Sequence, residues 1–187
     1  NFVVGGMYYD FKKSGVNVED PDGVYLTICN EKGELNSTFN VHHFMGSWQT
    51  NQLLSTSDGG YYLLTESVFL KKEDVASGTS SITNEHFTNQ NAMVYKFNTE
   101  SKLAWEYEVK RDEQRSVNDG AKANRVWGGV LSNDQLILVY RDAWARHDGI
   151  KRDVITYPVS AWTGYVFETL TTEGKLQKTI LIKDQKI

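Results

Sequence analysis

The segments VYLTICNEKGEL (residues 24–35), MVYKFNTESKL (93–103) and VFETLTTEGKL (166–176) share one pattern. Each contains an alternating apolar run, a short polar turn with a charged residue, and a leucine that opens a second alternating run. Such turns are typical of a β-hairpin with one residue at positive φ. The leucines at the end of each segment, Leu35, Leu103 and Leu176, therefore indicate that one hairpin occurs three times in the chain.

A second element precedes each hairpin. It is a nearly continuous apolar run, found as FVVGG (2–6), YYLLT (61–65) and LILVY (136–140). Continuous apolar runs are typical of strands that are buried on both faces. Before the last two runs, QLLS (52–55) and GVLS (129–132) supply one more strand. The repeated unit is therefore predicted to be four short antiparallel strands within about 60 to 75 residues.

Strand patterns cover most of the chain. Leu103, Trp105, Tyr107 and Val109 are spaced by two, which places them on one face of a strand and would scatter them around a helix. The polar segments 71–91 and 111–124 are predicted to be long loops. The fold class is all-β, with the following strands: 2–9, 24–30, 35–44, 61–69, 92–98, 103–109, 135–140, 164–170 and 176–182.

Tandem four-stranded antiparallel units that need neighbours to bury their faces are typical of a β-propeller. VVGG (3–6) resembles the glycine doublet of kelch blades, and KLAWE (102–106) resembles a strand of quinoprotein-type propellers. The resemblance implies that residues 1–187 are a single all-β repeat region, about two and a half blades of a partial β-propeller. The remainder of a larger propeller is then its first expected partner. The alternative is a β-sandwich.

Composition narrows the function classes. The chain has 187 residues with 20 basic and 24 acidic side chains, a net charge of −4, which argues against nucleic-acid binding. No apolar run is long enough for a transmembrane helix. The single cysteine, Cys29, excludes an internal disulfide and is predicted to be a small core residue. The sequence does not indicate the cellular compartment of the protein, although the resemblance to bacterial propellers weakly favours a periplasmic, cell-surface or secreted location.

Metal and cofactor signals are weak. His42 and His43 are adjacent in a predicted strand and would point to opposite faces, so they cannot share one metal ion. Residues 17–23 hold three carboxylates that suit a calcium loop or, more simply, a turn before a strand. His86 and His147 are predicted to lie alone in loops. We therefore expect no metal site, no cofactor and no catalytic residue.

Residues 141–153 form the densest polar and aromatic stretch, and Trp162 follows soon after. Indole rings stack on apolar C–H surfaces, and Arg and Asp give oriented hydrogen bonds, as in protein or glycan recognition. The predicted ligand-binding residues are Arg141, Asp142, Trp144, His147 and Trp162. The competing interpretation is that this stretch packs between sheets, with Trp144 as a buried plug.

The favoured function is a non-enzymatic binding or scaffold module for a protein or glycan partner. The alternative is a glycan-active hydrolase-like propeller enzyme that uses loop carboxylates from Glu66, Asp142 and Asp148. A carboxylate pair in an open cleft would favour the enzyme, and a large exposed apolar patch would favour the scaffold.

Overall fold

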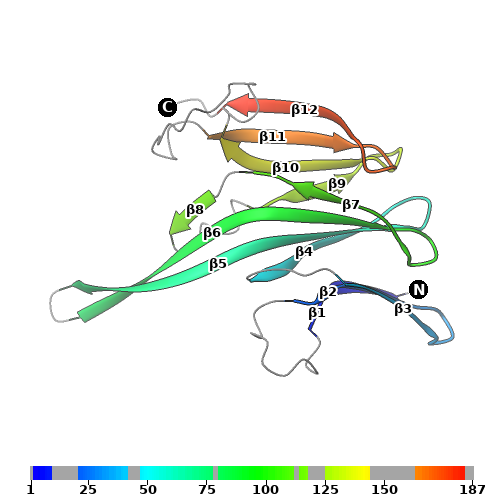
Figure 1. The fold of residues 1–187 in the computed structure, drawn as a ribbon, viewed down its shortest axis with the longest axis horizontal. Helices are drawn as coiled ribbons and strands as arrows, with labels where there is room; N and C mark the ends of the chain where they lie inside the picture. The colour runs from blue at the N-terminus through cyan, green and yellow to red at the C-terminus, as the bar shows by residue number, and fades with distance from the viewer. Residues whose placement is uncertain are drawn as a thin grey trace.

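The computed structural model describes residues 2–9, 21–41, 47–77, 80–111, 114–117, 125–143 and 163–183 (Figure 1). These residues form twelve strands and contain no helix. The strands are β1 (Phe2–Tyr8), β2 (Gly23–Cys29), β3 (Leu35–Val41), β4 (Trp48–Ser55), β5 (Tyr61–Ser77), β6 (Ser80–Phe97), β7 (Leu103–Val109), β8 (Gln114–Val117), β9 (Trp127–Val130), β10 (Leu136–Ala143), β11 (Thr163–Leu170) and β12 (Leu176–Lys183). The all-β prediction is confirmed.

The strands form three antiparallel sheets in chain order. Sheet 1 has the order β1-β2-β3, sheet 2 the order β4-β5-β6-β7, and sheet 3 the order β12-β11-β10-β9. Strand β8 also joins sheet 2 by pairing with β6. Each strand pairs with its sequence neighbour within these paths, so the predicted four-stranded unit is present in sheets 2 and 3.

Five tight turns inside these sheets share one geometry. In each, the first residue after the strand accepts a hydrogen bond from the N–H three residues on, and its own N–H donates to the carbonyl four residues on. The residue three positions into the turn has positive φ, as in a type I turn followed by a bulge. These residues are Gly33 (80°), Gly59 (84°), Ser101 (64°), Asp134 (59°) and Gly174 (79°).

The three leucines that define the sequence repeat occupy matching positions. Each opens the strand that follows the hairpin turn, and each pairs with the last residue of the preceding strand: Leu35 with Cys29, Leu103 with Phe97, and Leu176 with Leu170. The hairpin recognised from the sequence is therefore the same structural element in all three sheets.

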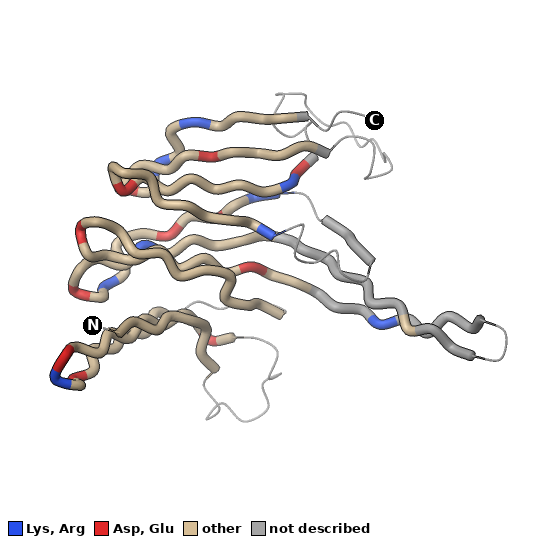
Figure 2. The backbone as a smooth tube through the Cα atoms, turned by 180° about the vertical axis from the view of Figure 1, so that it is seen from behind, with Lys and Arg blue, Asp and Glu red and all other residues tan. Residues whose placement is uncertain are grey.

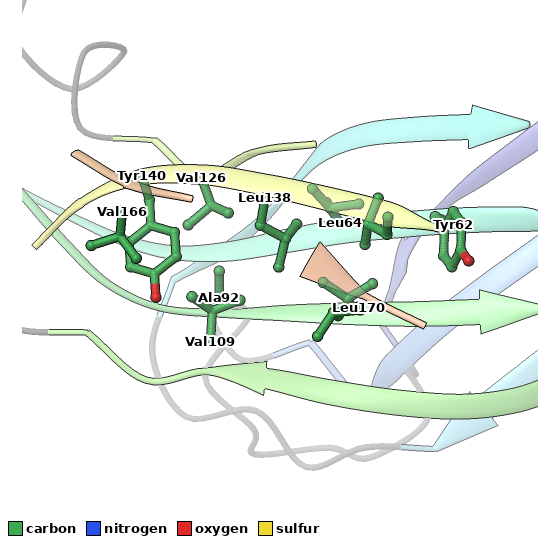
Figure 3. Packing of buried hydrophobic residues seen from close by; sticks show 11 residues of the cluster. Tyr62, Leu64, Ala92, Val109, Val126, Leu138, Tyr140, Val166 and Leu170 are labelled. Carbon is green, nitrogen blue, oxygen red and sulfur yellow. The ribbon is translucent and has the colours of Figure 1, made fainter. Parts of the chain in front are cut away.

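The sheets stack face to face in chain order, with sheet 2 in the middle (Figure 1). We call the face of a sheet that points toward the preceding sheet its leading face, and the opposite face its trailing face. On β5, Leu63 packs with sheet 1 residues such as Leu26, while Leu64 packs with sheet 3 residues such as Leu138. Figure 3 shows this second cluster, with Leu64 and Leu138 lying between the two sheets. The prediction of burial on both faces is confirmed for run 61–65 and is wrong for run 2–6, in which Phe2 and Val4 are exposed.

The predicted loop 71–91 is wrong. Strands β5 and β6 pair continuously as far as Ser77 and Ser80 and extend as a two-stranded arm beyond the stacked sheets (Figure 1). A ribbon that covers no core needs no apolar face, which explains why its sequence lacks strand periodicity. In the parts of the chain that are described, no helix is long and apolar enough to cross a membrane.

Candidate functional site

A buried ion pair joins the first half of β5 to the residue after Lys110, beyond the end of β7. Arg111 donates from Nη2 to Oε1 of Glu66, and both side chains are completely inaccessible to solvent. Burial lowers the pKa of Arg111, while the charges of Glu66 and then Asp142 oppose that shift. Asp142, on the leading face of β10, is also fully buried. Two carboxylates and one guanidinium therefore meet between sheets 2 and 3, closed off from water.

Two phenols extend this polar layer. The hydroxyl of Tyr107 donates to Oε2 of Glu168 at 3.2 Å. Burial, and then the charge of Glu168, raise the pKa of Tyr107 and of Tyr140 well above the ordinary value. Both phenols are thus held as protonated donors beside a carboxylate. The arrangement satisfies buried charge within the interface; it does not present a nucleophile or acid–base pair at a surface.

A second set of contacts joins the turns of sheet 2 to those of sheet 3. The carboxylate of Asp134 accepts from the Ser57 N–H and Oγ, each at 2.6 Å, and its backbone carbonyl accepts from the Tyr62 hydroxyl at 2.7 Å. The hydrogen bonds from Ser57 lower the pKa of Asp134. Further along the sheets, Trp105 Nε1 donates to the Thr172 carbonyl at 2.7 Å.

The leading face of sheet 1 has no sheet against it among the described residues. Its first row, next to the hairpin turn, is Phe2, Cys29 and Leu35, with Phe2 and Leu35 each 70% exposed. Its third row holds Tyr25 and Phe39, whose rings stack at 6.0 Å, and Phe39 is 60% exposed. Cys29 is half-buried on this face, so its prediction as a core residue is wrong.

The trailing face of sheet 3 is also largely apolar, and in the described part of the chain no sheet covers it. A continuous row runs across all four strands through Trp127, Val139, Phe167 and Ile180. Ile182, in the next row, is 53% exposed and Trp127 is 48% exposed. Figure 2 shows Lys, Arg, Asp and Glu gathered mainly at the hairpin turns, with long uncharged stretches of strand between them. The two outer faces of the stack, here named the end faces, thus present apolar surface.

Of the predicted ligand-binding residues, Arg141 and Asp142 are described. They belong to strand β10 and not to a loop, and they point to opposite faces of the sheet. Arg141 lies on the end face, with its guanidinium 5.7 Å from the ring centroid of Tyr165, whereas Asp142 is buried against sheet 2. The other three, Trp144, His147 and Trp162, lie outside the described residues, so the loop site stays a prediction.

Of the other histidines and acidic residues considered in the sequence, some also lie outside the described residues. His42, His43, Asp148 and most of the acidic stretch 17–23 lie outside the described residues. His86 is a strand residue of β6, opposite Lys71 and Val117, and not a loop residue. Within the described ranges, no cluster of three or more His, Cys, Asp or Glu side chains could hold a metal ion.

The chain matches no protein-family model, no curated protein and no solved structure. The proposed function therefore depends on the contacts and exposed surfaces within the chain.

Two features of the molecule were not predicted from the sequence, the buried ion pair of Arg111 and the apolar end face of sheet 3. Arg111 gives no pattern by which its ion pair could have been found. The end face of sheet 3 does have a signal, because Ile180-Leu181-Ile182 is an apolar run of the kind that indicates burial on both faces.

Proposed function

We propose that this chain is a run of consecutive propeller-type blades that acts as a non-enzymatic scaffold, with protein as the partner of its end faces. The observation that carries the proposal is the contrast between the middle sheet and the outer ones. Both faces of sheet 2 are covered by its neighbours in the chain, whereas the equivalent apolar faces at the two ends are uncovered. Large exposed apolar surfaces of this kind mark protein interaction sites.

The stacking order supports blades over a sandwich. A β-sandwich has two layers, and its outer faces are polar. Here three sheets stack in chain order, and their closest backbone approach is along β4, which lies beside both β1 and β9. Propeller blades likewise contact their neighbours in sequence order around a central axis.

The contacts of the carboxylates favour a scaffold over a hydrolase. Glu66 and Asp142, two of the three acidic residues considered for catalysis, face the buried Arg111 and not an open cleft. A hydrolytic pair needs access to substrate and water. The hypothesis of a glycan partner depends on Trp144, His147 and Trp162, which lie outside the described residues, so it stays a prediction from the sequence.

The experiment is to replace Ile180 and Ile182 together by threonine and to measure both stability and binding of an apolar dye by the dilute protein. Threonine keeps the β-branched shape, so we expect the free energy of unfolding to fall by less than about 1 kcal/mol. Dye fluorescence should fall clearly, because the apolar surface is smaller.

The matched control is Lys175→Thr, an exposed position on the turn of the same hairpin, which should change neither measurement. Unchanged dye binding in the double variant, or a loss of stability typical of a core position, would contradict a docking role for this face.

A further inference from the structure

We propose that the end face of sheet 3 in one chain packs on the end face of sheet 1 in a second copy, head to tail. This inference rests on the proposed scaffold function and names the partner. Inside the chain a trailing face meets a leading face twice, where sheet 1 meets sheet 2 and where sheet 2 meets sheet 3. The end faces are one further leading face and one further trailing face of the same kind.

The leading faces match row by row. The row next to the hairpin turn is Tyr61, Phe97 and Leu103 in sheet 2, and Leu136, Leu170 and Leu176 in sheet 3. Phe97, Leu136 and Leu170 in these rows are fully buried. In sheet 1 the equivalent row is Phe2, Cys29 and Leu35, of which Phe2 and Leu35 are exposed and Cys29 is half-buried. This row is therefore largely covered in sheets 2 and 3, apart from Leu176, which is 48% exposed, and largely open in sheet 1.

The trailing faces match as well. In sheet 2 the row through Gln52, Leu64, Val94 and Tyr107 packs against sheet 3, and Leu64 and Val94 are buried. The equivalent row of sheet 3 is Trp127, Val139, Phe167 and Ile180. This outer row is wholly apolar, while the covered row of sheet 2 includes a glutamine. It is therefore suited to the apolar leading face of a following sheet.

A polar link recurs at each internal interface and points to the same direction of stacking. Near the start of the last strand, Asn36 Nδ2 donates to the carbonyl of Glu100 at 3.5 Å, and Trp105 Nε1 donates to that of Thr172 at 2.7 Å. Both acceptors lie in the hairpin turn of the next sheet. The matching position in sheet 3 is Lys178, which pairs with Thr169 as Trp105 pairs with Lys96.

In a second copy, Lys178 would face the hairpin turn of sheet 1, which carries the two acidic residues Glu31 and Glu34 and one basic residue, Lys32. Lys178 and Glu31 are both exposed within the single chain. Lys178 therefore occupies the position that the hydrogen-bond donor has at each internal interface, and the turn that it would reach has more acidic than basic residues. Stacking two trailing faces on each other would instead bring together two faces that each carry the cations Lys178 and Arg141, which is unfavourable.

Head-to-tail contacts generate rings when the rotation closes. The described part of each chain forms three sheets, so two copies would bring twice three sheets together, within the range of about four to eight blades of closed propellers. We therefore expect a dimer held by two equivalent interfaces.

The experiment compares Leu35→Lys, which blocks the leading end face, with Ile180→Lys, which blocks the trailing end face. Both positions are exposed, so both variants should fold. The unaltered chain should sediment as a dimer and each variant as a monomer at the same concentration. An equimolar mixture of the two variants should form a heterodimer, because one intact pair of faces remains.

The outcomes separate this inference from the scaffold proposal. A monomeric unaltered chain whose dye binding still depends on Ile180 and Ile182 would overturn self-pairing and leave a different protein as partner. A Leu35→Lys variant that dimerises like the unaltered chain would show that like faces pair. If circular dichroism shows either lysine variant to be unfolded, Leu35→Thr and Ile180→Thr replace them, with weakened dimerisation as the expected result.

A charge swap tests the link itself. Lys178→Glu should raise the dimer dissociation constant by about two- to thirtyfold, because each dimer loses two such links, and combining it with Glu31→Lys should restore it. Equal dissociation constants for the unaltered chain and Lys178→Glu would show that Lys178 does not contribute to the interface.

Discussion

At the scale of single residues, the pair of Glu66 and Arg111 shows how a buried charge is held in this protein. Removing two charges from water costs free energy that their attraction only partly returns, so such a pair adds little net stability. Losing one member is different, because the other charge then stays buried without its counter-ion. The pair is therefore expected to act as a requirement for correct stacking more than as a source of stability.

Replacing Arg111 by methionine should lower the free energy of unfolding by about 3–5 kcal/mol, because Glu66 is left buried beside Asp142. The double variant Arg111→Met with Glu66→Leu should recover part of that loss, since the carboxylate of Glu66 is gone while Asp142 stays buried without the guanidinium. Urea unfolding of the three proteins provides the measurement. A double variant as unstable as the single one would mean that the pair supplies net stability itself.

The sequence could not reveal this cluster. Burial on both faces was predicted for the apolar runs, but Glu66 follows one run and Arg111 follows another strand, and nothing in either pattern relates them. Asp142 was singled out, but as a member of a recognition loop. Its alternation with Tyr140 continues strand β10 by three residues beyond the apolar run, and that continuation turns its side chain toward sheet 2.

At the scale of elements, the hairpins were the predictable part. Turn chemistry and period-two alternation are local, so the three matching leucines could be placed correctly from the sequence alone. The β5–β6 arm was not predictable in this way, because a ribbon outside the core follows no apolar period. What the hairpins contact also required the structure, as Trp105 and the turn before Leu176 illustrate.

The turn glycines provide a test of this contact. Gly33 and Gly174 have nearly the same φ, 80° and 79°, in equivalent turns. A Cβ at Gly33 would meet nothing within 4 Å, whereas one at Gly174 would lie 2.6 Å from the Trp105 ring. Gly33→Ala should therefore cost roughly 1 kcal/mol for the backbone alone, and Gly174→Ala should cost about 1–3 kcal/mol more.

Thermal unfolding of both variants checks the difference. Because the backbone strain is matched, the excess loss reports only the packing of Trp105 on the turn of the next sheet. Equal losses for the two variants would show that Trp105 can move away without cost, and the inter-sheet link at this turn would then contribute nothing to stacking.

At the scale of the whole molecule, the stability of each sheet depends mainly on its contacts with the adjacent sheets. Sheet 2 is covered on both faces, while sheets 1 and 3 each have one covered face and one end face. In such quasi-one-dimensional arrays, stability is the sum of each unit and its contacts with the next. The middle unit has two such contacts and each outer unit has one, so local stability must fall from the middle toward the ends.

Native-state hydrogen exchange should show this gradient directly. In the monomeric chain, amides of β5 and β6 within residues 61–66 and 92–97 should exchange slowest, because opening them requires separation from both neighbours. Amides of β2 and β11 should exchange faster, although each of these strands is also paired on both sides within its sheet. Raising the chain concentration should slow exchange in sheets 1 and 3 and leave sheet 2 unchanged, because head-to-tail pairing covers only the end faces. Uniform protection across the three sheets at low concentration would mean that the stack unfolds as one cooperative body, and the stepwise account of its stability would then be wrong.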